Sequence, residues 1–279
     1  MQLYVEIIIL AVLCALNSAI TGSWLVVNGM SLMSDGMSHA LILGIAVTFC
    51  LIHSTTSWLL LLGAGCSGWA LTQLILWLMD RHHMNHDAAL GLLFPSFFSL
   101  GTILITKYAS SIHLDVDMVL LGEITFAPLK RMILWNSDCG PIGMWYLIIL
   151  LLVIAASVFA LFNYLTVCAF DKTFAVTQGI SIKAIQSLLL LLTSITTVMC
   201  FDLVGSLAII ALMIVPTATA LLNCHSMKTT MISSMIYGTM SAIIGCLLGI
   251  YFDVSVAGSI ASMTGLLFFV KVSELYYSI

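Results

Sequence analysis

The stretch "LYVEIIILAVLCALNSAITGSWLVV", residues 3–27, decides the fold, because a single charged side chain, Glu6, interrupts an otherwise apolar run. A helix needs about 20 mainly apolar residues to cross the hydrocarbon core of a bilayer. Comparable runs occupy Ser57–Met79 and Trp145–Val167. We therefore expect each of these runs to span a membrane, and we interpret the first as a retained span rather than a signal peptide.

The composition supports the same class. The 279 residues are 62% hydrophobic and 7% charged, whereas soluble domains carry about 25% charged residues. The apolar runs are continuous, unlike the alternating segments of a β-barrel. We predict an all-α, polytopic transmembrane helical bundle of eight or nine spans, one domain over residues 1–279 with no soluble part. The predicted spans are Leu3–Val27, Ser34–Ile52, Ser57–Met79, Ala88–Thr106, Trp145–Val167, Ala184–Cys200, Leu203–Leu222, Thr230–Tyr251 and Val256–Val270. Two of the later spans are short enough to be half-helices.

Several function classes find no support in the sequence. The net charge of −4 leaves no basic patch for nucleic acid. The eight cysteines stand singly, without a CxxC spacing, and we interpret them as small packing residues. There is no GxxxxGK[ST] phosphate loop and no HExxH or GxSxG motif. If ATP drives this protein, a second subunit must hydrolyse it.

Three polar segments separate the apolar runs: Asp80–Asp87, Lys107–Gly143 and Phe170–Lys183. The second is long, and we expect it to be a functional loop that holds a short helix or a re-entrant element. If Phe170–Lys183 is cytoplasmic, five of the eight basic residues lie inside and the N-terminus lies outside, as the positive-inside rule favours. The five are Arg81, Lys172, Lys183, Lys228 and Lys271.

Asp35 and His39 stand out within the second apolar run, four residues apart and therefore on one face of a helix. An ionisable group at the centre of a span costs about 2.5–3.5 kcal/mol on insertion scales, so such groups tend to mark substrate paths. A carboxylate and an imidazole together can bind Mn²⁺, Fe²⁺ or Zn²⁺. The spacing equally fits a structural role, in which Asp35 caps the N-terminus of the helix and His39 pairs with the Asp35 carboxylate.

Other polar residues offer weaker candidates for a cation path. "HHMNHD", residues 82–87, is expected to be a solvated turn, with an exit-side metal contact as the alternative. "HLDVD" places His113 on the same side as two aspartates if that segment is extended. Glu123 lies in an apolar run, and Asp202 begins a predicted span, where it caps the helix or faces the mouth of a pathway.

Three segments together resemble the permease subunit of bacterial ATP-binding-cassette importers for zinc, manganese or iron. "SDGMSHA", residues 34–40, resembles that family's Gly-Asp-Ala-hydrophobic-Ser-His-Ala segment. The stretch at 170–185 is similar to its Asp-x-x-Phe-Ala-x-x-x-Gly segment, and "DLVGSLAIIALMIVPTATALL", residues 202–222, resembles its Val-Gly-x-Leu stretch ending Pro-Ala-Ala-Thr-Ala. Ser34 and Gly36 replace the family's usual glycine and alanine.

The resemblance implies a multi-pass protein of the bacterial cytoplasmic membrane that imports a divalent Mn, Zn or Fe ion by alternating access. It implies no cofactor of its own and three protein partners: cytoplasmic ATPase subunits, a second permease protomer (identical or paralogous) and an extracytoplasmic metal-binding protein. Asp35 and His39 become the expected cargo contacts. Residues 170–183 become the segment that couples to the ATPase, through Asp171, Phe174, Ala175 and Gly179.

Two alternatives belong to other classes. A proton-coupled secondary transporter could use Asp35 and His39 as a proton relay, but it would have no need for an ATPase docking segment. A membrane scaffold that transports nothing would leave the same two residues in a structural role.

Overall fold

In the computed structural model, which describes residues 2–52, 58–108, 124–125, 127–134 and 137–278, the chain is predominantly helical. The elements, in chain order, are α1 (Gln2–Val27), α2 (Met33–Ile52), α3 (Trp58–His82), α4 (His86–Tyr108), η2 (Ala127–Leu129), β1 (Arg131–Leu134), β2 (Ser137–Pro141), α6 (Ile142–Phe170), α7 (Lys172–Thr177), α8 (Ile182–Val204), α9 (Ser206–Leu221), α10 (Met227–Tyr251) and α11 (Val256–Ser278). Within the described residues, 8 helices are long and apolar enough to cross a membrane, and α9 is a shorter apolar helix. The prediction of an all-α bundle with eight or nine spans is confirmed.

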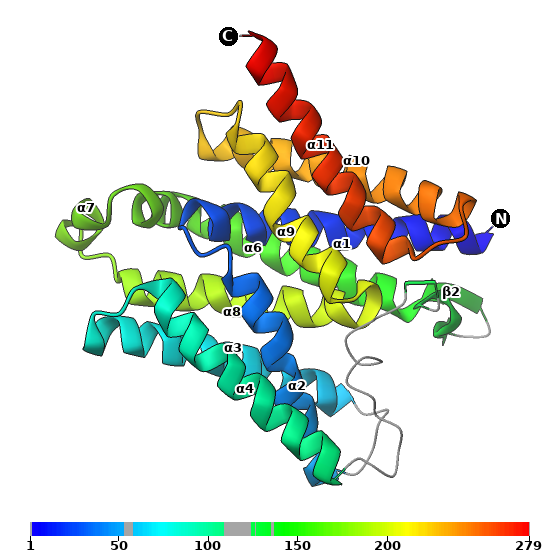
Figure 1. The fold of residues 1–279 in the computed structure, drawn as a ribbon, viewed down its shortest axis with the longest axis horizontal. Coiled ribbons are helices and arrows are strands. Elements are labelled where there is room, and N and C mark those ends of the chain that lie inside the picture. Colours follow the sequence, from blue (N-terminus) through cyan, green and yellow to red (C-terminus); the bar gives the residue numbers. More distant parts are fainter. Residues whose placement is uncertain (1, 53–57, 109–123, 126, 135–136, 279) are drawn as a thin grey trace.

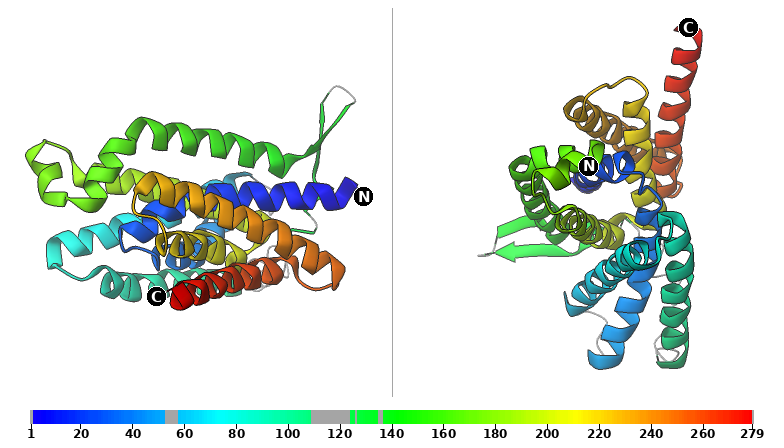
Figure 2. Two further views of the ribbon diagram at one scale, coloured as in Figure 1. Left: turned by 90° about the horizontal axis from the view of Figure 1, so that it is seen from above. Right: turned by 90° about the vertical axis from the view of Figure 1, so that its left-hand side faces the viewer.

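The long helices run side by side and give the bundle two distinct ends (Figure 1). The N-terminus and the β1–β2 hairpin lie at one end, which we call the outer end; α7 and the turn between α3 and α4 lie at the opposite, inner end. Helix α1 is central and packs against α6, α8, α9 and α10. The helices α2 to α4 form one flank, and α9 to α11 form another (Figure 2).

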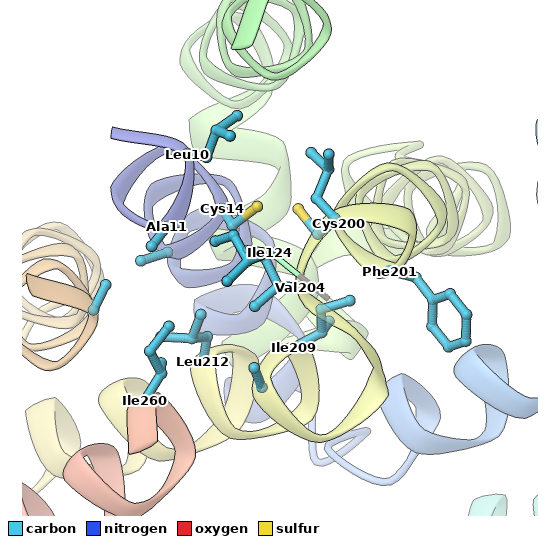
Figure 3. Close-up of a cluster of buried hydrophobic side chains, with 14 of the residues drawn as sticks. Leu10, Ala11, Cys14, Ile124, Cys200, Phe201, Val204, Ile209, Leu212 and Ile260 are labelled. Atoms are coloured by element: carbon cyan, nitrogen blue, oxygen red, sulfur yellow. The ribbon is translucent and has the colours of Figure 1, made fainter. Parts of the chain in front are cut away.

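The largest apolar core lies around α1, where it meets α8 and α9. Figure 3 shows Leu10 and Cys14 of α1 beside Cys200 and Val204 of α8. All four side chains are fully buried, with no exposed surface. These two cysteines therefore serve as small core residues, in line with the interpretation of the sequence.

Glycines allow the α2–α3 and α1–α9 contacts to be close. A Cβ atom at Gly44 of α2 would collide with the backbone carbonyl of Gly63 on α3, and one at Gly22 of α1 would collide with the carbonyl of Met213 on α9. In lipid the hydrophobic effect does not drive helices together. Small residues favour helix association there because they permit dense van der Waals contact between backbones.

The limits of α8 and α9 differ from those predicted. The span expected at 184–200 is a full helix of 23 residues, α8, which carries polar residues at both ends. Asp202 lies in the last turn of α8, so its predicted place at the start of the next span is wrong. The break falls at Gly205, whose φ of +83° favours glycine, and α9 begins at Ser206 without a side-chain cap. The span expected at 256–270 is likewise longer, with 23 residues in α11.

The long segment between α4 and α6 holds an element that the sequence did not reveal. The short helix predicted there corresponds to η2, but it is followed by an antiparallel hairpin in which Arg131 pairs with Pro141. The side chain of Arg131 also lies 3.0 Å from a carboxylate oxygen of Glu6, which ties the hairpin to α1.

The basic residues are distributed as the positive-inside rule predicts. Arg81, Lys172 and Lys183 lie at the inner end, where α3 ends and α8 begins; Lys228 begins α10 there and Lys271 lies in the last turns of α11. The hairpin and the N-terminus lie at the other end. This arrangement supports the assignment of the inner end to the cytoplasm.

The close packing of α2 on α3 gives the first testable prediction. We expect Gly44→Ala to lower the melting temperature of the detergent-solubilised protein, because the added methyl group meets backbone atoms, and overpacking typically costs about 1–3 kcal/mol. Gly265→Ala is the matched control, since a Cβ there meets no atom within 4 Å. Equal melting temperatures for the two variants would contradict the packing argument.

Candidate metal path and coupling segment

Asp35 and His39 lie on one face of α2, within its first two turns. Asp35 Oδ1 is 3.4 Å from His39 Nε2, and the two side chains are 44% and 26% exposed. Two ligands about 2.1 Å from a tetrahedral ion are themselves about 3.4 Å apart. The separation therefore suits both an ion pair and two adjacent ligands of one metal ion, and the partial exposure leaves the two atoms accessible.

The environment of His39 is aromatic on its α4 side. Its ring centroid lies 5.3 Å from that of Phe94 and 5.6 Å from that of Phe98. The His39 Nδ1 atom is buried and makes no hydrogen bond to any described residue. The two rings pack against the imidazole, and the acidic side chain that contacts it in the described part of the chain is Asp35.

Gly36, Ala40 and Gly44 place a small residue at every fourth position of α2, and this spacing shapes the site indirectly. Gly36 admits Leu90 of α4, and Gly44 admits the backbone of α3, so both neighbouring helices approach closely. In the described part of the chain the groups that reach His39 from α4 are apolar rings.

Asp202, the other predicted cation contact that the structure describes, does not join this pair. Asp202 is exposed in the last turn of α8, at the outer end of the bundle. His113 and Glu123 lie outside the described residues. Among the residues that are described, no three His, Cys, Asp or Glu side chains form a group that could hold a metal ion. One protomer thus offers two ligands at this site within its described part.

The histidine-rich segment at the inner end is a turn between two helices. His82 ends α3 and His86 begins α4, so the two do not share one helix face. His86 Nδ1 lies 3.4 Å from Asp87 Oδ1, and the His82 ring packs against Trp77. This geometry agrees with the polar turn that the sequence favoured.

The segment at 170–183 is a short helix whose motif residues each have a local role. Asp171 Oδ1 accepts a hydrogen bond of 2.8 Å from the backbone N–H of Phe174, and so caps α7. Ala175 is fully buried, while Phe174 is 49% exposed. Gly179 follows α7 in the left-handed conformation, with φ of +72°, which favours glycine at the end of a helix. The helix therefore presents an aromatic side chain to its surroundings at the inner end (Figure 1).

Polar contacts between α3 and α8 were missed by the sequence analysis. Lys183 Nζ lies 2.8 Å from Asp80 Oδ2, and Gln73 Nε2 donates a hydrogen bond of 2.9 Å to Ser187 Oγ. The first contact joins two of the polar segments of the sequence, which is a weak signal of proximity. Gln73 and Ser187, which form the second contact, carry no charge and belong to no motif, so the sequence gives no sign that they meet.

Comparisons with known proteins find relatives that match most of this chain. The chain is 32% identical to the manganese transport system membrane protein MntD of Bacillus subtilis, over 93% of this chain and 88% of that protein. It is 36% identical to the zinc transport system membrane protein TroD of Treponema pallidum, over 94% of this chain and 71% of that protein. Both relatives are named as membrane proteins of transport systems.

Solved structures show the same fold. The structure of PsaBC from Streptococcus pneumoniae in complex with Fab matches with a TM-score of 0.78 at 25% identity, covering 97% of this chain and 91% of that one. An inward-facing transporter of the metal-chelate ABC type matches with a TM-score of 0.70 at 14% identity, a likeness of fold alone. The model of the ABC 3 transport family matches residues 1–274, and the chain belongs to that family.

Proposed function

We propose that this protein is the permease of an importer that moves a divalent transition-metal ion, manganese or zinc, into the cytoplasm, with iron as a further candidate. As a multi-pass membrane member of the ABC 3 transport family, it is the transport subunit, and ATP hydrolysis takes place in a separate subunit. The observation that carries the cargo assignment is the 3.4 Å Asp35–His39 pair, partly exposed on a transmembrane helix. Family membership gives no support to the proton-coupled alternative.

The Asp–His pair contacts the cargo during passage. A carboxylate oxygen and an imidazole nitrogen suit Mn²⁺, Fe²⁺ and Zn²⁺ alike, so the two residues select a class of ion rather than one metal. The described part of one protomer contributes too few ligands for a closed cage, and a second protomer completes the path. Weak, incomplete coordination suits a transporter, because the ion must also leave.

The two ends of the bundle suit different partners. The exposed Phe174 and Val176 of α7 provide an apolar surface for the ATPase at the inner end. The hairpin and the segment that holds η2 lie at the outer end, where a metal-binding donor protein delivers the ion. In this arrangement residues 1–279 form one permease domain, and residues 170–183 are its coupling segment.

Asp35→Asn and His39→Ala test the cargo site. We expect each to lower metal uptake by cells at least about tenfold, because removal of a direct ligand costs no less than loss of an outer-shell partner, about 10–100-fold. Cellular Mn, Zn and Fe are measured by elemental analysis. Asp87→Asn is the control, since that carboxylate also lies 3.4 Å from a histidine but at the inner turn. Normal uptake by both variants would favour a structural pair or a scaffold protein.

Phe174→Asp tests the coupling segment. A charged side chain would disrupt an apolar docking surface, so we expect the ATPase no longer to co-purify with the permease, while the permease itself still folds. Leu129→Asp makes the same change at an exposed residue of the outer end and is expected to leave co-purification intact. Retention of the ATPase by the Phe174 variant would exclude α7 as the principal contact.

A further inference from the structure

Helix α3 is fastened to α8 by a line of polar contacts that starts beside α7. The two helices run in opposite directions, and the contacts follow one seam between them. The α3–α8 seam consists of Asp80–Lys183 at 2.8 Å, Gln73–Ser187 at 2.9 Å and the Ser194 hydroxyl to the Gly65 carbonyl at 3.2 Å.

The middle contact of the seam is the most informative one. Most hydroxyls of the described spans bond to a carbonyl of their own helix, as Thr193 does to Leu189. Gln73 and Ser187, by contrast, join two side chains from different helices, and both are partly buried. Asp80 and Lys183 are 55% and 77% exposed, and such surface ion pairs contribute little. Gln73 and Ser187 are therefore the side-chain pair that, together with the Ser194–Gly65 hydrogen bond, holds the two helices in register.

The opposite face of α3 is fastened to the helix that carries the Asp–His pair. The Ser67 hydroxyl of α3 lies 2.9 Å from the carbonyl oxygen of Ala40, the residue after His39, and 2.8 Å from the carbonyl oxygen of Ala64 on its own helix, so its one proton is shared between the two helices. The backbones of α2 and α3 also meet at Gly44 and Gly63. Helix α3 thus makes polar contacts with α8 on one face, and on the other face it contacts α2 at Ala40, directly beside His39.

We propose that α3 is a rigid link that transmits displacement of the coupling segment to the Asp–His pair. Helix α7 connects to α8 through residues 178–181, α8 holds α3 through the seam, and α3 holds α2 through Ser67. Gln73 and Ser187 are positioning residues: they keep α3 in register with α8 and do not contact the cargo. The inference rests on the proposed function, because it assumes an ATPase at α7 and an ion at Asp35.

The test is the number of ions moved per ATP hydrolysed. The full complex of permease, ATPase and donor protein is reconstituted in liposomes, and uptake of Mn²⁺ and Zn²⁺ is measured beside ATP hydrolysis. We expect Gln73→Leu and Ser187→Ala each to keep ATP hydrolysis but to lower the ratio by about threefold, the change expected from loss of one average interhelical hydrogen bond in a membrane. Ser262→Ala, which removes a hydroxyl bonded within its own helix, is expected to keep the wild-type ratio.

A reversed pair separates positioning from folding. Gln73→Ser combined with Ser187→Gln returns a hydroxyl and an amide to the seam, so we expect it to restore the ratio. Uptake and hydrolysis that fall in proportion in the single variants, or a ratio that stays at the wild-type value, would overturn the inference while leaving the proposed function intact. A wild-type complex that hydrolyses ATP but moves neither ion, nor Fe²⁺ supplied in their place, would overturn the proposed function, and the inference with it.

Discussion

Hydrocarbon offers no hydrogen-bond partners, and the other features of this molecule follow from that constraint. A polar group in a span is stabilised by a partner within the protein, and the hydroxyls of Thr193, Thr196 and Ser38 bond to carbonyls one turn earlier on their own helices. These bonds satisfy the hydroxyls but do not hold helices together. Association depends instead on close backbone approach at glycines and on the small number of bonds that cross between helices.

Bonds that cross between helices therefore carry information about which helices belong together. Asn17 of α1 donates to the carbonyl of Leu147 on α6, and Thr217 of α9 meets Ser234 of α10 at 2.8 Å. The seam between α3 and α8 belongs to this class. Each of these contacts fixes the register of two helices that lipid alone would allow to slide. Sliding of one helix past another matters in a transporter, because a helix displacement that does not reach the transport site moves no ion.

The sequence predicted the elements better than their junctions. Long apolar runs define α1 and α6 within a few residues, because hydropathy and length set a span directly. The break between α8 and α9 was placed too early, since Asp202 looks like a helix start in one dimension, whereas Gly205 makes the turn. The hairpin was missed because its residues alternate weakly and lie in a polar segment, and strand pairing depends on a contact between distant positions.

The candidate site divides in the same way. The spacing of Asp35 and His39 placed both on one face of α2, and the family resemblance singled out Asp171 and Gly179, which cap and end α7 in the structure. Contacts from other helices could not be read from the spacing: the rings of Phe94 and Phe98 against His39 exist only because α4 packs on α2. The same holds for Gln73, whose importance comes from a partner 114 positions away in the chain.

The proposed cargo site, with two ligands from the described part of one protomer, has a mechanical consequence. An ion held there by few groups would change its coordination strongly with small displacements of α2, whereas a closed cage would resist them. The helix that positions α2 then matters as much as the ligands, since it decides when the coordination is complete. Helix α3 meets α2 through the close backbone approach of Gly44 and Gly63, with the Ser67 hydroxyl 2.9 Å from the Ala40 carbonyl. In the proposed transport cycle, this close packing would let a displacement that begins at α7 move the helix that carries Asp35 and His39 rather than bend α3.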